Sequence, residues 1–223
     1  MSERVLLPLV LAAALWGARP TPLRAQVIIE REAWPPAARE YVGANYRLHV
    51  IERGPNRVTC EVVVWPDVAS SAPYPVSPVY AEHLGSDEVI QADHPLIVAQ
   101  AADLVEGATT QAEVVERVVA FVREHVAYTP VAARDAVSVL ETGEGDCVGY
   151  ANLSLALLRA AGIPARRVLG VLVRQGSWEN HCWVDVHHGD VGWISVDPQM
   201  TVSPRHVRGG LAGDSVVTWL GSQ

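Results

Sequence analysis

The sequence lacks any run of lysine or arginine, and its 17 basic residues are outnumbered by 25 acidic ones, for a formal net charge of −8. Clustered basic residues are the usual mark of a nucleic-acid-binding protein, so that class of function is not indicated. An acidic balance bears on solubility and identifies no partner. Internal repeats and low-complexity tracts are also lacking. Hydrophobic residues make up 49% of the 223, which predicts one globular domain with a substantial core and a short appendage.

Long apolar runs are lacking too, and the run at residues 5–14 falls short of the roughly 20 residues that span a bilayer. It follows a short segment with one positive charge, as in a secretory signal peptide. We therefore predict a signal peptide over residues 1–25 and export to the periplasm or the extracellular space. Cleavage is expected after Ala25, with Ala18 as the other small residue; the alternative is a buried or membrane-resting N-terminal helix.

Cysteine is scarce, with three residues at Cys60, Cys147 and Cys182. In an exported protein an odd count leaves at least one thiol unpaired, so a disulfide framework is not expected. A Cys60–Cys182 disulfide is compatible with the sequence, and Cys147–Cys182 is less so. A free thiol in an oxidising compartment points toward thiol chemistry.

Proline and turn residues divide the N-terminal part of the chain. Residues 26–45 read as irregular, and residues 66–92 contain four prolines and read mostly as loop. Between them, β-rich runs at 47–52 and 57–65 are separated by a turn at 53–56, which predicts a hairpin. We assign 26–92 to an N-terminal β-rich extension of unassigned role.

Three helices are predicted further along. The first runs from Asp93, as its cap, to about residue 105, with Pro95 in its first turn. The second opens with a Thr-Gln-Ala-Glu capping box at 110–113 and cannot pass about residue 128. The third covers 147–161 and ends at a glycine followed by a proline.

Strands are predicted after the third helix. Residues 168–173, 181–188 and 191–196 have strand patterns, with a polar loop at 174–180 and a weakly patterned tail at 199–223. Helices followed by antiparallel strands are typical of an α+β fold. We take 93–223 as one domain in which a helix packs on an antiparallel sheet.

Cys147 lies at the first turn of the third predicted helix, after Gly145 and Asp146. Free N–H groups and the positive end of the helix dipole favour an anion there, which suits a thiolate nucleophile. The same N–H groups can stabilise an oxyanion. The alternative is a small buried cysteine that falls at a helix start by chance.

A nucleophilic thiol needs a base, and the base needs an orienting partner. Strand alternation puts His181, Trp183 and Asp185 on one face, with Cys182 on the other. If the hairpin turns on the two residues 189–190, Asp197 lies near Cys182 or His181. A carboxylate beside the imidazole of His181 is therefore expected.

Four motifs resemble the transglutaminase-like superfamily. They are Gly-Asp-Cys-Val-Gly-Tyr-Ala-Asn-Leu at 145–153, Ala-Gly-Ile-Pro-Ala-Arg at 161–166, His-Cys-Trp-Val-Asp-Val at 181–186 and Gly-Trp-Ile-Ser-Val-Asp-Pro at 192–198. The resemblance covers about residues 93–200. It implies a papain/transglutaminase-like core with Cys147, His181 and Asp197 as catalytic triad.

Other candidates are weaker. Tyr128, Tyr150 and Trp183 are candidates for substrate binding or for an oxyanion hydrogen bond. Tyr128 can equally be a core aromatic residue, and packing is the preferred interpretation of Tyr150 and Trp183. No Cys-x-x-Cys or His-x-x-x-His spacing occurs, so no metal site and no cofactor are predicted.

We therefore predict a cysteine-dependent enzyme that attacks peptide or glutamine-type amides of a protein or peptide substrate through a thioester. Hydrolysis, as in a protease or amidase, is the expected outcome. The alternatives are a cross-linking transglutaminase and a non-catalytic binding module on the same fold. After signal removal no stable membrane span is expected.

Overall fold

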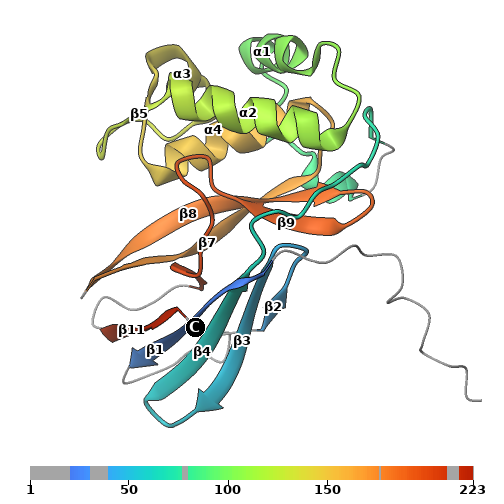
Figure 1. The fold of residues 1–223 in the computed structure, drawn as a ribbon. Coiled ribbons are helices and arrows are strands. Elements are labelled where there is room, and N and C mark those ends of the chain that lie inside the picture. The colour runs from blue at the N-terminus through green and yellow to red at the C-terminus, as the bar shows by residue number, and fades with distance from the viewer. Residues whose placement is uncertain (1–20, 31–39, 77–79, 176, 210–215, 223) are drawn as a thin grey trace, which may run out of the picture.

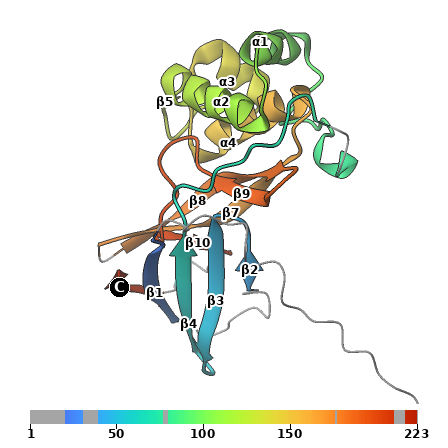
Figure 2. The same ribbon diagram turned by 45° about the vertical axis from the view of Figure 1, so that its right-hand side comes forward.

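The computed structural model describes residues 21–30, 40–76, 80–175, 177–209 and 216–222. In this part of the chain the elements form three layers (Figure 1). A helical layer covers one face of a four-stranded antiparallel sheet, and a five-stranded antiparallel sheet lies on the other side (Figure 2). The fold is thus α+β, with the helix that carries Cys147 packed on an antiparallel sheet, as predicted.

The helices are α1 (Pro95–Val105), α2 (Gln111–His125), α3 (Ala136–Thr142) and α4 (Cys147–Ala160), with a 3-10 turn at Ala81–His83. The four-stranded sheet has the order β10 (His206–Arg208), β7 (Ala165–Arg174), β8 (Ser177–His188) and β9 (Gly192–Val196). The five-stranded sheet has the order β11 (Val216–Ser222), β1 (Leu23–Glu30), β4 (Arg57–Val64), β3 (Tyr46–Arg53) and β2 (Tyr41–Val42). Short strands β5 (Ala127–Tyr128) and β6 (Glu144–Gly145) pair in parallel.

Helix α4 is the centre of the helical layer. Every residue from 149 to 158 is buried, and α1, α2, α3 and β8 all contact the helix. This sequence has no charged residue before Arg159 and is mostly apolar, as expected for a helix that is surrounded by others. The rigid setting fixes the position of Cys147 at its first turn.

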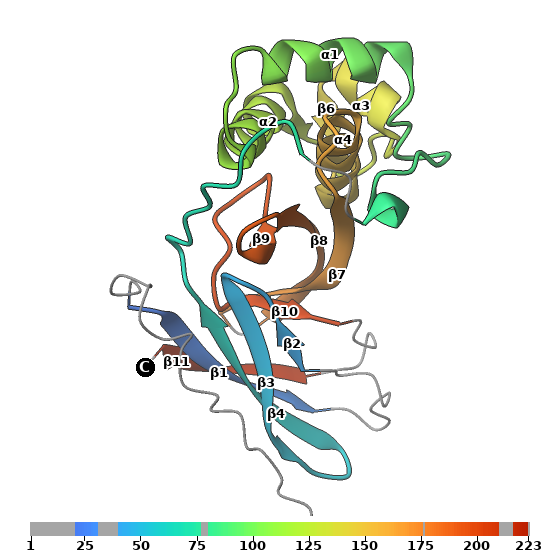
Figure 3. The ribbon, with the colours of Figure 1, turned by 90° about the vertical axis from the view of Figure 1, so that its right-hand side faces the viewer.

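The two faces of the four-stranded sheet serve two separate cores. Cys182, Val184 and Val186 of β8 pack against the helices. Val171 and Val173 of β7 pack against the N-terminal sheet. Successive strand residues point to opposite faces, so one sheet can belong to both cores. Figure 3 shows this sheet between the helical layer and the N-terminal sheet. The N-terminal strands are thereby packed directly beneath the sheet that carries His181.

The predicted helix capped by Thr110 has both hydrogen bonds of its capping box. The helix that begins at Pro95 is also present, but its cap is His94 and not Asp93. The short helix α3 was missed, and the polar loop predicted at 174–180 is wrong because β8 begins at Ser177. The glutamate and tryptophan of this segment pair with β7, so tertiary pairing overrides its polar composition.

The predicted hairpin is present as β3 and β4. However, residues 26–45 are not irregular throughout, since β1 covers much of the first half and β2 lies at Tyr41–Val42. The tail is also structured: β10 joins β7, and β11 joins β1. Strands from both ends of the chain therefore share one sheet, a pairing that local pattern cannot reveal.

The apolar run of the predicted signal peptide lies outside the described residues. Strand β1 begins at Leu23, inside the predicted 1–25 segment, and Ala25 is buried and pairs with Val62. Cleavage after Ala18 would keep this strand whole, whereas cleavage after Ala25 would remove three paired residues. Among the helices of the described chain, none has the length and apolarity needed to cross a membrane.

Candidate active site

The start of α4 is held by Asp146. Its Oδ1 accepts hydrogen bonds from the N–H groups of Val148 and Gly149, both at 3.0 Å, which makes it an N-cap. Its Oδ2 accepts from Arg134 Nε at 2.7 Å. Because Asp146 uses the second and third N–H groups of the helix, the N–H of Cys147 has no hydrogen-bond partner within the described ranges. The first turn thus presents a thiol and a free N–H together.

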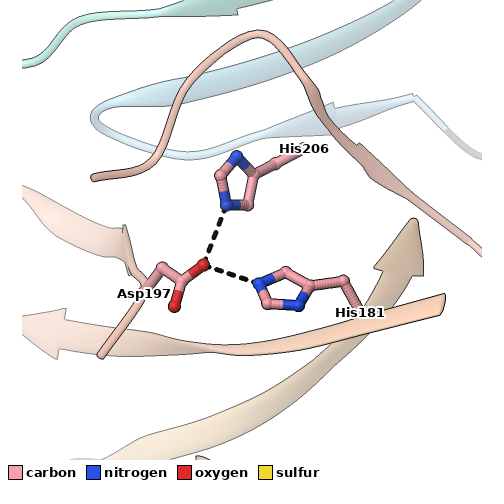
Figure 4. A group of neighbouring side chains, drawn as sticks. All are labelled: His181, Asp197 and His206. Carbon is pink, nitrogen blue, oxygen red and sulfur yellow. Dashed lines mark hydrogen bonds and ion pairs between the residues drawn. The ribbon is translucent and has the colours of Figure 1, made fainter. Parts of the chain in front are cut away.

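His181 and Asp197 lie side by side at the edge of the sheet (Figure 4). The Nε2 of His181 is 2.7 Å from Oδ2 of Asp197, and both residues are buried. This leaves Nδ1 of the ring free to face Cys147, whose side chain lies close enough to raise the pKa of His181. The structure therefore brings together all three residues predicted as a triad.

The hairpin that carries Asp197 turns differently from the prediction. His188 pairs with Gly192, so the loop has three residues and not two, and the register shifts by one. The last pair is Val184 with Val196, after which Asp197 would oppose Trp183. The positive φ of 86° at Gly192 supports this longer turn. Asp197 still reaches His181 as a diagonal neighbour on the same face.

A second histidine, His206, contacts the same carboxylate oxygen and was not predicted as a site residue. Its Nε2 lies 2.9 Å from Oδ2 of Asp197, and its side chain is completely buried (Figure 4). His206 opens β10 in the segment taken as a weakly patterned tail. A histidine two residues after Pro204 and directly before Val207 was the only signal available.

The hydrogen bonds set the charges of the site. Burial alone would lower the pKa of His181, but its bonds to Asp197 and Cys147 and their charges raise it to about 9. Burial would raise the pKa of Asp197, but its bonds to His181 and His206 lower it to about 2. Near neutral pH the site thus favours an imidazolium at His181 beside the Asp197 carboxylate, and a charged imidazolium suits proton transfer to a leaving group.

The other three predicted site residues differ in how far they are exposed to solvent. Tyr128 has 60% of its surface exposed, and its backbone pairs with Gly145, two residues before Cys147. Tyr150 is buried and its hydroxyl donates to the carbonyl of Val126. Trp183 is fully buried. Of the three, only Tyr128 can touch a substrate in this conformation.

The remaining two cysteines are buried free thiols. Cys60 belongs to the core between the sheets, whereas Cys182 belongs to the helical core. The disulfide that the sequence left open between them is therefore not formed. Burial raises the pKa of Cys60 to about 11 and that of Cys182 to about 12, so neither is a competing nucleophile near neutral pH.

Ligand atoms of His181, Asp197 and His206 lie within 4.8 Å of one another. Two imidazoles and a carboxylate are a ligand set that Zn²⁺ accepts. Here each imidazole is already hydrogen-bonded to the carboxylate, which accounts for the grouping.

Two of the motifs are joined by an ion pair whose carboxylate is fully buried. Arg166, the last residue of the Ala-Gly-Ile-Pro-Ala-Arg motif, lies 3.2 Å from Oδ2 of Asp185 in the His-Cys-Trp-Val-Asp-Val motif. Arg208 pairs with the other oxygen, and the hydroxyl of Tyr41 donates to Oδ2 at 2.9 Å. The network ties β7, β8, β10 and the N-terminal sheet together.

A thiol at a helix N-terminus, a histidine and a carboxylate define a protein with a Cys–His–Asp site on an α+β fold. Residues 98–198 match the family model of the transglutaminase-like superfamily. This part of the chain, which contains Cys147, His181 and Asp197, is therefore similar to that superfamily.

Similar proteins agree with this assignment. A protein-glutamine gamma-glutamyltransferase of Pseudomonas aeruginosa is 38% identical over 116 residues, which cover 43% of this chain but only 17% of that protein. The periplasmic domain of TgpA from Pseudomonas aeruginosa is 27% identical, with a TM-score of 0.52, and the match covers 83% of this chain and 75% of that one. A candidate cysteine protease from Cytophaga hutchinsonii, 12% identical, has a TM-score of 0.56 over 91% of this chain and 88% of its own, which shows a shared fold.

Proposed function

We propose that the protein is a cysteine-dependent acyl-transfer enzyme that acts on peptide or glutamine-type amides of a protein or peptide substrate. The observation that carries this proposal is the placement of His181 between Cys147 and Asp197, with a 2.7 Å bond to the carboxylate. Cys147 is the nucleophile, His181 transfers the proton, and Asp197 orients the imidazole. An inert binding module has no chemical need for all three groups so close together.

The reaction follows from these positions. The Cys147 sulfur attacks the amide carbonyl carbon, and the carbonyl π electrons move to the oxygen. When the tetrahedral intermediate collapses, the C–N bond breaks and the nitrogen leaves as ammonia or an amine with the proton from His181. A thioester remains on Cys147. Water or a primary amine then attacks it, gives its proton to His181 and releases the thiolate.

The negatively charged oxygen of the tetrahedral intermediate needs hydrogen-bond donors to stabilise it. The N–H of Cys147 is the best placed, because Asp146 occupies the next two N–H groups of the helix. The exposed hydroxyl of Tyr128 is a second donor that we propose, since its strand runs beside Gly145. Tyr150 and Trp183 are assigned no contact with substrate.

The acceptor decides between two reactions. Hydrolysis is the outcome predicted from the sequence. Amine transfer is favoured by the 38% identity to a protein named for gamma-glutamyl transfer. The triad chemistry serves both, because the same thioester precedes either step.

Incubation of the purified protein with a glutamine-containing peptide tests the proposal. Ammonia release that Cys147→Ala abolishes is expected. A labelled primary amine added to the same reaction separates the acceptors: label in the peptide shows transfer, and glutamate in its place shows hydrolysis. Absence of both products, with peptide-bond cleavage also missing, would contradict the enzyme proposal.

We also propose that the protein works outside the cytoplasm. The predicted signal peptide and the likeness to a periplasmic domain support this location. Fractionation of cells that express the full chain tests it: the mature protein is expected in the periplasmic or external fraction, shortened at its N-terminus. A full-length protein in the cytoplasmic fraction would contradict it.

A further inference from the structure

His206 is held in one orientation by contacts on both ring nitrogens. On one side Nε2 lies 2.9 Å from Oδ2 of Asp197. On the other, the backbone N–H of Ser203 donates to Nδ1 at 3.1 Å. A nitrogen that accepts an N–H hydrogen bond carries no proton, so the ring proton of a neutral His206 is on Nε2 and points at Asp197. The carbonyl oxygen of Ser203, 3.2 Å from Nδ1, and its hydroxyl oxygen, 3.3 Å away, are the contacts that would favour a proton there.

The Asp197 carboxylate is thereby fixed at both oxygens. Its Oδ1 accepts from the N–H of Gln199 at 2.8 Å, and Oδ2 accepts from His206 and His181. A carboxylate on a short side chain can rotate about χ2, a broad torsion with little intrinsic preference. Donors on both sides remove that freedom and leave Oδ2 facing His181.

The N-terminal sheet, in turn, holds His206 in place. The hydroxyl of Tyr46, on β3, donates to the backbone carbonyl of His206 at 2.6 Å, and Tyr46 is fully buried. The ring of Trp183 packs edge-on against the imidazole with centroids 5.3 Å apart. Gly170 makes this packing feasible, since a Cβ there would lie 2.5 Å from the Trp183 ring.

We propose that His206 is a positioning residue, which holds the Asp197 carboxylate toward His181, and that the N-terminal sheet maintains His206 through Tyr46. His206 lies outside residues 98–198, the part that matches the family model. This inference rests on the proposed function, because it assigns His206 a share in the same triad. It also gives the N-terminal strands a role: they support the geometry of the site from below.

Two amide substitutions separate the contacts of the two ring nitrogens. His206→Gln puts an N–H₂ donor near the place of Nε2 and keeps the bond to Asp197. His206→Asn puts its amide near the place of Nδ1, where it can meet Ser203 but cannot reach Asp197. Both replacements bury an amide, and neither side chain is larger than histidine. The two variants therefore differ mainly in where the amide lies.

The first readout is the NMR titration of His181 in the full chain, which needs no substrate. In the wild type and in His206→Gln, the pKa is expected near the value of about 9 set by Asp197. In His206→Asn it is expected to fall toward the ordinary value of histidine. The ¹⁵N shifts of the wild-type His206 ring are expected to show the proton on Nε2. An unchanged or raised pKa of His181 in His206→Asn would overturn the proposal, as would a proton on Nδ1 of a neutral His206.

The second readout is turnover of the glutamine peptide. Misplacement of a catalytic group costs up to about a hundredfold in rate, so kcat is expected to fall about tenfold or more in His206→Asn. KM is expected to change by less than about twofold, because His206 touches no substrate. Loss of thermal stability without these changes would show a merely structural role and overturn the proposal.

Tyr46→Phe removes one hydroxyl and keeps the ring. This variant tests the proposal even if His206→Asn does not fold. A smaller fall in the pKa of His181 and in kcat is expected, and no change would overturn the part assigned to the N-terminal sheet. The proposed function and the positioning role of His206 can also be contradicted independently of each other. A wild type that turns over no amide but titrates as described contradicts the proposed function alone. An active wild type with two wild-type-like His206 variants contradicts the positioning role alone.

Discussion

Nε2 of His181 lies 2.7 Å from Oδ2 of Asp197, although the two residues are not opposite each other in the sheet. Asp197 follows the last pair of β9, and His181 is its diagonal neighbour across the ladder. Diagonal neighbours on one face of an antiparallel pair are within reach of long or planar side chains. Since His181 and Trp183 share a face, the carboxylate meets the imidazole and does not enter the helical core.

Replacement of the nucleophile is expected to remove all activity. Cys147→Ala deletes the sulfur that forms the thioester, while the buried part of α4 from 149 to 158 is untouched. Ammonia release should therefore vanish and the circular dichroism spectrum remain. Cys60→Ala is the matched control, because that thiol lies in the core between the sheets, and it should keep turnover. Activity in Cys147→Ala would refute covalent catalysis by this residue.

Asp197→Asn is expected to leave weak residual activity. The amide keeps the size of the side chain but loses the charge that favours the imidazolium of His181. A fall in kcat of about 10²-fold or more is expected, from steady-state rates with the glutamine peptide. Activity equal to that of the wild type would remove the orienting role assigned to Asp197.

The pH profile should lose activity on the alkaline side near pH 9. The pKa of His181 is raised to about 9, so its proton is present below that pH and lost above it. The imidazolium then no longer supplies the proton that the leaving nitrogen needs. The measurement is kcat against pH, and the alkaline limb should move to lower pH in Asp197→Asn. A limb at the same pH in both proteins would show that the carboxylate does not set this pKa.

The same shifts predict how stability depends on pH. The pKa of Asp197 is lowered to about 2, so its contribution is present above the unfolded value of about 4 and is lost as pH falls through 2. The raised pKa of His181 contributes below the unfolded value of about 6.5, and this contribution is lost as pH rises through 9. The free energies of unfolding of the wild type and of Asp197→Asn, measured in urea, should therefore differ most between about pH 4 and pH 7.

Removal of Asp185 should destabilise the fold. Its carboxylate is fully buried between Arg166 and Arg208, and its loss leaves two cations without their partner. Breaking a buried pair in this way costs about 3–5 kcal/mol, so Asp185→Ala should lower the free energy of unfolding by about that much in urea. Glu179→Ala is the control, because its bridge to Arg174 is exposed and worth about 0–1 kcal/mol. Equal losses in the two variants would contradict the importance of the buried network.

A chelator should leave activity unchanged. The imidazoles of His181 and His206 are each hydrogen-bonded to the carboxylate of Asp197, and the proposed reaction uses no metal. Turnover is to be measured after prolonged treatment with EDTA and after addition of Zn²⁺. Loss on chelation with recovery on Zn²⁺ would mean that the three residues act as metal ligands.

Much of the core domain could be predicted because its signals are local. The capping box at Thr110, the Ala- and Leu-rich helix after Cys147 and the alternation after His181 each specify an element within one short segment. Two of these segments also contain Cys147 and His181, and Asp197 directly follows the next predicted strand. The resemblance of four motifs to one family added the order in which the elements assemble.

The rest depends on contacts between distant segments. Strand β11 exists because it pairs with β1, and β10 because it pairs with β7, so neither needs a strong pattern of its own. His206 was missed for the same reason: only the tertiary fold brings it to Asp197. The turn before Gly192 was predicted one residue too short, since a positive φ can lie at several positions of a hairpin.

The reactivity of Cys147 toward a small neutral alkylating reagent across pH tests the central claim most directly. Alkylation of Cys147 near neutral pH is expected to be much faster than that of an ordinary exposed thiol, because His181 stabilises the thiolate, and His181→Gln should abolish the advantage. Mass spectrometry of the labelled peptides separates Cys147 from the buried Cys60 and Cys182. A rate equal to that of an ordinary thiol in the wild type, or a rate that His181→Gln leaves unchanged, would contradict the account.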